Sequence, residues 1–489
     1  MPAGERGPTE MSRLRSVGTT LAVASLLVAT AGATASAESG AARSSAPDDV
    51  WRADGYGMIV AIRDGTLRQY QTTSVGCLPG PSARRSGTER GETMYDSTDG
   101  MVVGVRPARR PNRAELRFTH APGHRELHRI SALPRTCTRP PASGPVAAFD
   151  TFWQSYQENY PFFAAKGVDW HAMRDRYRPR VGPNTTEDQL FAIMRDMIDP
   201  LDDAHVDLTA GPDRYFTETR PGTTAPTADF DRRVRAYIVE RDLGGRPLTQ
   251  YANGRVAYAD LPDGQGYLRI NAFMAYLPDR PPSYLTDSAE LDRALDAFLT
   301  PDRLDRLRGL IIDVRVNDGG MDNLGLRLAA RLSDRPYLAY VKQARNDPRD
   351  PSRFTRPQPI EVRPNPETTR YTGPVAILTG GSTVSAGETF VQAMMGRAGS
   401  TIRIGEATQG VFSDVMQRRL PNGWQAGVPN EVFRTRDGRT FDGTGIPPNV
   451  LEPVFTEDEF ANHRDSAFDR AVRMLPTGRA PGVLPTEAS

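Results

Sequence analysis

The sequence GGSTVSAGETF, residues 380–390, places two serines between a short apolar strand and a helix. The strand is the run PVAIL, residues 374–378. At the N-terminus of a helix the first backbone N–H groups have no intrahelical partner, and the helix dipole is positive. A developing oxyanion is stabilised at such a position. The pattern favours a nucleophilic serine, although Ser382 or Ser385 taken alone would more often be a helix cap. Glu388 is interpreted as a cap or ion-pair residue without a chemical role.

A second block, LIIDVRVNDGG at residues 310–320, has the same layout of an apolar strand followed by small residues. Glycines at Gly319 and Gly320 would let backbone N–H groups approach a ligand closely, as an oxyanion site requires. The block alone is weak evidence, because Asn-Asp-Gly-Gly is also an ordinary turn. Asp313 and Arg315 are interpreted as a structural charged pair at the end of a buried strand.

Strands and helices alternate around these two blocks. We expect strands at 256–261, 267–270, 309–314 and 337–341, and helices at 289–299 and 324–332. Alternation of this kind predicts an α/β domain with helices packed on a sheet. We assign this domain to residues 226–460, and a C-terminal helix with a flexible tail to 461–489.

The segment 145–225 has helical periodicity instead. Aromatic residues recur at helical spacing between residues 149 and 160, and a second apolar stripe runs from 190 to 198. The segment ends in DPLDDAHVDL, residues 199–208, which delivers His205 into a strand. The alternative interpretation of His205 is a structural histidine bonded to Asp202, Asp203 or Asp207.

The N-terminal 37 residues have the pattern of a secretory signal peptide. Two arginines precede an apolar run at residues 21–31, and Ala35-Ser36-Ala37 follows as a cleavage site. We predict cleavage after Ala37 and a secreted protein. No other long uncharged apolar segment occurs, so no membrane span is expected in the mature chain.

Residues 38–141 are expected to form a small β domain of barrel or sandwich type after a short polar leader. The two cysteines of the chain, Cys77 and Cys137, both lie there. An oxidising compartment favours a disulfide between them, which would contribute roughly 4 kcal/mol. Three histidines between residues 120 and 128 have helical spacing, but an Ala-Pro-Gly interruption argues against a helix, so we predict no metal site.

Composition excludes some classes of partner. The chain has 61 basic and 60 acidic residues, for a formal net charge of +1, and is 38% apolar. Such a balance gives no overall field for a polyanion, so nucleic acid is not an expected partner. No cofactor is expected either.

Taken in order, four blocks resemble the C-terminal processing, or tail-specific, family of serine proteases, which includes the tricorn core protease. The resemblance covers residues 145–453. The blocks are the Asp203-Ala204-His205 turn, residues 310–320, residues 382–390, and the glycine-rich stretches 405–410 and 443–448. It implies a crotonase-like catalytic domain with Ser385 as the nucleophile.

The resemblance also implies which residue acts as the general base for the serine. In the Ser/Lys branch of the family a lysine follows the glycine that is here Gly410, but this chain has Val411. Its only lysines, Lys166 and Lys342, lie elsewhere. The tricorn-like branch instead uses a histidine of the earlier turn, which is His205. Imidazole has a suitable pKa for this role.

By the same resemblance, Asp442 would orient the base, with Glu431 as the alternative carboxylate. Backbone N–H groups of Gly319 or Gly320 and of Ala386 would form the oxyanion hole. The chain departs from the family pattern at four positions. These are Ala204 for a serine, Asp318 for a glycine, Asp442 for a glutamate, and Asn449 for an aspartate.

The sequence therefore predicts a secreted serine endopeptidase that acts on a peptide or protein substrate. A catalytically silent binding protein on the same scaffold is the first alternative, since fold does not determine function. A hydrolase of a non-peptide ester or amide is the second. The interval 206–255 is too short for the PDZ module of many bacterial relatives, so none is expected. The oligomeric state is not predicted.

Overall fold

The computed structural model describes residues 49–97 and 101–477. The predicted signal peptide at 1–37, the polar leader up to residue 48 and the tail from residue 478 lie outside the described residues. Within the described ranges, no helix combines the length and the apolar character needed to cross a membrane.

A closed barrel of eight antiparallel strands forms the first part of the described chain. Strand β1 pairs with both β2 and β8, which closes the ring. Of the two β architectures that the sequence left open, the structure has the barrel. The strands are β1 (Val50–Ala53), β2 (Met58–Arg63), β3 (Thr66–Thr72), β4 (Cys77–Glu89), β5 (Glu92–Ser97), β6 (Val102–Pro107), β7 (Arg113–Phe118) and β8 (Arg125–Ile130).

Strand β2 is apolar up to its last residue, Arg63, because both of its faces are covered. Val60 lies in the barrel interior, whereas Ile59 packs on the outside against Cys137. Cys137 lies in the short helix α1 (Arg135–Thr138) and forms a disulfide with Cys77 at the start of β4. The predicted disulfide is confirmed, and it holds the segment after β8 against the barrel wall.

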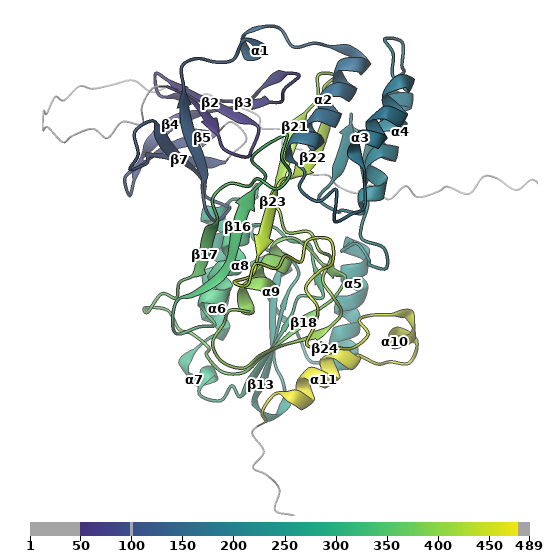
Figure 1. Cartoon of the computed structure of the whole chain (residues 1–489). Helices are drawn as coiled ribbons and strands as arrows, with labels where there is room; N and C mark the ends of the chain where they lie inside the picture. Colours follow the sequence, from purple (N-terminus) through teal and green to yellow (C-terminus); the bar gives the residue numbers. More distant parts are fainter. Residues whose placement is uncertain (1–48, 98–100, 478–489) are drawn as a thin grey trace, which may run out of the picture. The chain divides into compact units, whose positions relative to one another are not determined.

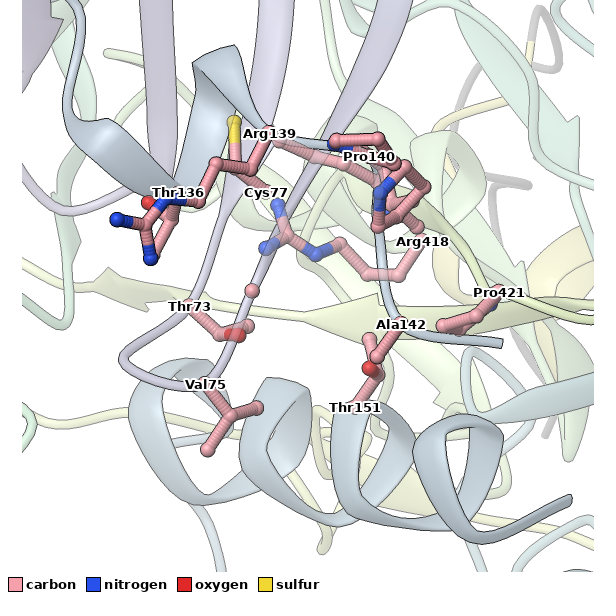
Figure 2. Close-up of a pocket in the computed structure, with 14 residues that line it drawn as sticks. Thr73, Val75, Cys77, Thr136, Arg139, Pro140, Ala142, Thr151, Arg418 and Pro421 are labelled. Carbon is pink, nitrogen blue, oxygen red and sulfur yellow. The ribbon is translucent and has the colours of Figure 1, made fainter. Parts of the chain in front are cut away.

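A small pocket of about 160 Å³ lies where the chain leaves the barrel. Residues 139–142 and helix α2 (Gly144–Asn159) form its sides, next to Cys77. Figure 2 shows the side chain of Arg418 reaching across this pocket. Arg418 is buried, and its guanidinium donates to the carbonyls of Gly57 and Thr72. None of the candidate catalytic residues lines the pocket.

The helical segment consists of α2, α3 (Trp170–Tyr177) and α4 (Glu187–Ile198). Thr186 and Gln189 form a capping box at the start of α4. The apolar faces of the three helices belong to one core with the barrel interior and with β22. Figure 1 shows these helices beside β21 and β22. Strands β9 (Asp207–Ala210), β10 (Arg214–Thr217), β21 (Val415–Arg419) and β22 (Gln425–Pro429) form a sheet in the order β10-β9-β22-β21.

A seven-stranded sheet with helices on both faces forms the α/β part, as the alternating pattern predicted. Its order is β11-β12-β13-β14-β18-β20-β24, and the last five strands are parallel. Figure 1 shows α5 and α11 on one side of it, and α6, α8 and α9 pack on the other. The strands are β11 (Thr249–Tyr251), β12 (Val256–Asp260), β13 (Gln265–Ile270), β14 (Gly309–Asp313), β18 (Val375–Thr379), β20 (Thr401–Gly405) and β24 (Val450–Leu451).

The helices of this part are α5 (Ala228–Tyr237), α6 (Tyr284–Phe298), α7 (Pro301–Leu304), α8 (Asp322–Ala330), α9 (Ala386–Met394), α10 (Glu457–Ala461) and α11 (Ser466–Met474). Helix α6 begins five residues earlier than predicted, because Ser283 caps it through the N–H of Thr286. Two further sheets complete the fold. One has the order β17-β16-β23, from β17 (Gln358–Val362), β16 (Tyr337–Ala344) and β23 (Glu431–Arg434), and the other pairs β15 (Val316–Asn317) with β19 (Ser382–Thr383).

Candidate active site

Ser385 stands at the junction between β19 and helix α9. It is the N-cap of α9 and has φ 55° and ψ −117°, a left-handed conformation that disfavours any residue with a side chain. Strained backbone of this kind persists where the surrounding structure enforces it, often at functional sites. Ser385 is half-buried, whereas Ser382 is buried and donates its hydroxyl to the carbonyl of Thr224. Of the two candidate serines, Ser385 is therefore the available one.

The parallel pairing of β14 with β18 and of β15 with β19 brings the glycine block beside Ser385. A Cβ atom added to Gly319 would lie 2.7 Å from the Cβ of Ser385. The N–H of Gly319 donates to the side-chain oxygen of Asn317 at 3.0 Å. Among the described residues, the N–H groups of Gly320 and Ala386 have no acceptor. Two unpaired backbone donors thus flank the serine.

Glu388, to which the sequence assigned no chemistry, connects the serine to a neighbouring loop. Its buried carboxylate accepts the N–H of Gly410 at 2.6 Å and that of Val411 at 2.8 Å. It also accepts the N–H of Ser385 at 3.3 Å. Burial raises the pKa of Glu388 to about 8, although these hydrogen bonds act in the opposite direction. Glu388 therefore fixes the loop at Gly410 relative to the start of α9.

His205 lies in a turn that Asp203 shapes. The Asp203 carboxylate accepts the backbone N–H of His205 at 3.0 Å and the hydroxyl of Tyr160 at 2.8 Å. Asp203 does not bond to Nδ1 of the imidazole, because this buried nitrogen has no hydrogen-bond partner among the described residues. The contact with Asp203 therefore involves the backbone of the histidine and leaves its ring nitrogen Nδ1 available.

The environment of His205 favours the neutral imidazole. Burial lowers its pKa below the ordinary value, opposed by Asp203, Asp414 and a hydrogen bond to the backbone of Ser413. The same loop contacts the serine, because the carbonyl of Val411 accepts the N–H of Ser385 at 3.2 Å. Ser385 and His205 thus bond to the backbone of the same loop, Ser385 at Val411 and His205 at Ser413, which are two residues apart. No direct hydrogen bond between them is found in the part of the chain that the structure describes.

Asp442 is buried near this turn. Its carboxylate accepts the hydroxyl of Thr440 and hydrogen bonds from the backbone of Phe412 and Phe433. Burial raises the pKa of Asp442 to about 7, and the charge of Asp203 adds to the effect. The two carboxylates therefore interact, and Asp442 bonds to the backbone of the loop segment that follows Val411.

Glu431, the alternative carboxylate, belongs to a separate buried cluster. It accepts the hydroxyl of Tyr56 at 2.6 Å and pairs with Lys342 at 3.1 Å. Lys342 also pairs with Asp414 at 3.1 Å. Burial alone would lower the pKa of Lys342, but the two carboxylates raise it overall, so this lysine is a cation and not a base. The other lysine, Lys166, donates to the carbonyl of Asp202.

A larger pocket of about 410 Å³ adjoins the loop, between the barrel and strand β21. Asp414, Lys342 and Glu431 line it. Asp414 follows Val411 by three residues, which span at most about 11 Å. The described residues contain no group of three or more His, Cys, Asp or Glu side chains placed to hold a metal ion.

Two family models match the chain. The model of peptidase family S41 matches residues 264–451, which include Ser385, the glycine pair and Asp442. The model of the tricorn protease C1 domain matches residues 146–199. His205 lies between the two matched segments. No curated protein matches the chain.

Several solved structures resemble this chain, and the first of them shares its fold. A candidate peptidase from Parabacteroides merdae is 24% identical, with a TM-score of 0.56 over 68% of this chain and 97% of that one. The photosystem II D1 C-terminal processing protease is 17% identical, with a TM-score of 0.40 over 64% of this chain and 94% of that one. The tricorn protease is 16% identical, with a TM-score of 0.40 over 85% of this chain and 43% of that one.

Proposed function

The chain is a serine peptidase of the tail-specific protease family, and we propose that it cleaves peptide bonds through an acyl-enzyme on Ser385, with His205 as general base. One observation carries this proposal. Ser385 stands in a strained conformation at the start of α9, flanked by two backbone N–H groups that lack acceptors. A serine in a purely structural role needs neither feature.

In the proposed mechanism the Ser385 hydroxyl attacks the carbonyl carbon of the scissile peptide bond as His205 takes its proton. The tetrahedral intermediate carries a negative oxygen, which the N–H groups of Gly320 and Ala386 bind. Each such donor is worth about 3–4 kcal/mol of transition-state stabilisation in other serine hydrolases. Gly319 serves the same site differently, because its N–H holds the side chain of Asn317. Its missing side chain leaves room for Ser385.

His205 then protonates the amine that leaves, and a water molecule activated by the same imidazole releases the acyl group. The lowered pKa of His205 supports this assignment, since a base must be neutral at the working pH. We assign the orienting carboxylate to Asp442. Its approach to the free Nδ1 would accompany substrate binding, because catalytic hydrogen bonds often tighten only in the complex. Glu431 is less suited to orient the histidine, because its carboxylate already bonds to Lys342 and Tyr56.

We further propose that residues 226–460 form a crotonase-like catalytic domain, that residues 145–225 form the segment supplying the base, and that the protein is secreted after cleavage near Ala37. The sheet with helices on both faces supports the first assignment. The disulfide supports export, because disulfides persist in oxidising compartments.

The test is labelling of the purified protein with a fluorophosphonate probe, followed by mass spectrometry of the modified peptide. We expect modification of Ser385 that is lost in Ser385→Ala and strongly slowed in His205→Ala. Ser382→Ala is the matched control and should label normally. Cleavage of fluorescein-labelled casein, beside hydrolysis of a p-nitrophenyl ester, separates a peptidase from a hydrolase of other esters. Absence of labelling in folded protein would favour a binding protein on the same scaffold.

A further inference from the structure

The pocket of about 410 Å³ includes one open end of the eight-stranded barrel. We call this end the barrel mouth, and it is lined by Met58, Gln69, Leu116, Phe118 and Arg125. None of the candidate catalytic or oxyanion-hole residues lines the pocket. A closed barrel of eight strands is wide enough to hold one small ligand, and barrel mouths are frequent sites for such ligands. The barrel mouth is therefore a candidate ligand site separate from Ser385.

Arg125 extends into the barrel mouth. It is the first residue of β8 and lies opposite Leu116 of β7, and directly opposed residues share one face of a sheet. Its guanidinium carbon lies 4.3 Å from the ring centroids of Tyr56 and Phe118, and its Nη1 lies 3.6 Å from the sulfur of Met58. It forms no ion pair with any residue that the structure describes. This half-buried cation therefore has its charge available for an anion.

The other charged groups around the pocket are already bonded. Lys342 pairs with Asp414 and with Glu431, at 3.1 Å each. The guanidinium of Arg418 donates to two backbone carbonyls. Arg125 acts on the two carboxylates only from beyond ion-pair distance. Apart from two histidines, the charged lining residues are three cations and two carboxylates, which leaves a formal excess of one positive charge.

Gln69 adds a hydrogen-bond donor without an acceptor. It lies opposite Val60 of β2, whose side chain is in the barrel interior, so Gln69 also faces inward. Its exposed fraction is 9%, and its Nε2 has no hydrogen-bond partner among the described residues. A buried amide donor that lacks an acceptor is costly in free energy, and a bound acceptor would remove that cost. The polar groups left unpaired at the barrel mouth are thus donors.

We propose that the barrel mouth binds a small organic carboxylate with an apolar body. This binding is independent of the proposed peptidase chemistry. The carboxylate pairs with Arg125 and accepts a hydrogen bond from Gln69, while the apolar body packs against Met58, Leu116 and Phe118. The excess of one positive charge favours a singly charged carboxylate over a phosphate dianion, whose second charge would have no counterpart in the pocket.

The first experiment is isothermal titration calorimetry of the wild-type protein with hexanoate, octanoate and decanoate. We expect one site per chain, with affinity rising about fourfold for each added CH₂ until the mouth is filled. The uncharged 1-decanol should bind about tenfold more weakly than decanoate, because it cannot form the charged hydrogen bond with Arg125. Equal affinity for decanol and decanoate would overturn the proposal, as would the absence of binding by all three carboxylates.

The second experiment removes the cation. Arg125→Met keeps an apolar stem against Tyr56 and Phe118, and we expect decanoate affinity to fall at least about tenfold while decanol affinity stays unchanged. The matched control is Arg106→Met in β6, because Arg106 already pairs with Glu115 and does not line the pocket. Its decanoate affinity should equal that of the wild type. Wild-type affinity in a folded Arg125→Met variant would overturn the proposal.

The third experiment tests the amide. Gln69→Met removes the unpartnered donor and keeps the length of the side chain. We expect a higher melting temperature of the ligand-free protein together with decanoate affinity about fivefold lower. A glutamine with a purely structural role would give the opposite result, a lower melting temperature and unchanged decanoate affinity. That outcome would overturn the role of Gln69 in the site.

Fluorophosphonate labelling shows whether the carboxylate binds at the catalytic residues instead. Saturating decanoate should leave the labelling rate of Ser385 in the wild type unchanged. Protection of Ser385 that persists in Arg125→Met would locate the carboxylate at the oxyanion hole and overturn the barrel-mouth site. Absence of labelling in the wild type, together with decanoate binding that depends on Arg125, would instead overturn the proposed peptidase function and support this site.

Discussion

At the scale of single residues, the backbone of Ser385 is the feature with the clearest energetic consequence. Its φ of 55° and ψ of −117° lie in a region that glycine adopts freely. We therefore expect Ser385→Gly to be more stable than Ser385→Ala by about 1 kcal/mol, since left-handed strain of 1–3 kcal/mol is partly offset by the flexibility of unfolded glycine. Urea denaturation followed by tryptophan fluorescence measures the difference. An alanine variant as stable as the glycine variant would show that the strain is absent.

Gly319 allows a second prediction at this scale. It has φ +76°, and a Cβ would lie 2.7 Å from the Cβ of Ser385. Gly319→Ala should displace the serine and reduce fluorophosphonate labelling about 100-fold, as expected for a shift of about 1 Å. The control is Gly91→Ala, at φ +82° with open space around it. It carries similar backbone strain without the contact, so its labelling should equal that of the wild type.

At this scale the sequence indicated the candidate residues but not the hydrogen bonds that their backbone groups make. A serine at a helix start and a glycine pair after a buried strand are visible as patterns. That Asn317 occupies the N–H of Gly319, or that Glu388 bonds to Val411, depends on turns whose geometry a pattern does not specify. Glu388 in particular has the sequence signature of an ordinary cap.

At the scale of elements, the Lys342 cluster joins the strands around the pocket. Lys342 in β16 pairs with Glu431 in β23 and with Asp414 before β21. Lys342→Met leaves the buried Glu431 and the half-buried Asp414 without their cation, which should lower the free energy of unfolding by about 3 kcal/mol, most of it from Glu431. Adding Glu431→Gln should recover part of this loss. Thermal denaturation by circular dichroism measures both effects.

Lys166→Met provides the control for this prediction. Lys166 is the other lysine of the chain, and it donates to a carbonyl without an ion pair in the described structure. Its replacement should cost about 1 kcal/mol or less. A Lys342→Met variant no less stable than Lys166→Met would show that the cluster does not stabilise the junction.

Elements differed in how far the sequence could specify them. The buried strand at Gly309–Asp313 and the helix at Asp322–Ala330 have strong apolar signals and were predicted. The strand at Cys77–Glu89 was not, because its glycines, prolines and arginines contradict a strand locally. Pairing with β3 and β5 around the closed barrel imposes the extended conformation there. Such pairing cannot be recognised from the residues of the strand alone.

At the scale of the whole molecule, the disulfide restrains the connection from the barrel to the helical segment. Cys77 and Cys137 are 60 residues apart in sequence. Replacing both by serine removes a restraint on the unfolded chain worth about 4 kcal/mol in the chain-entropy model. We expect a lower urea midpoint, whereas fluorophosphonate labelling of the folded variant should be unchanged. The same result is expected when the wild type is unfolded in the presence of a reductant.

Stability and activity should respond to pH in opposite directions. Burial raises the pKa of Asp442 to about 7 and that of Glu388 to about 8, from ordinary values of 3.8 and 4.5. At pH values between the unfolded-state and folded-state pKa of these two groups, the folded protein binds more protons than the unfolded protein. The free energy of unfolding therefore decreases as pH rises from about 4 to about 8. Urea denaturation at pH 5 and pH 8 should therefore give a lower midpoint at pH 8. Asp442→Asn should remove part of this slope.

Activity should instead rise with pH, because His205 must be neutral to accept a proton. Its pKa is lowered by burial, so the acid limb of kcat/KM for casein should lie below the ordinary histidine value of 6.5. If Asp442 acts as a carboxylate, a second step near pH 7 should follow and should be absent in Asp442→Asn. An acid limb above pH 6.5 would contradict the role of His205, and the absence of a step near pH 7 would contradict the role of Asp442.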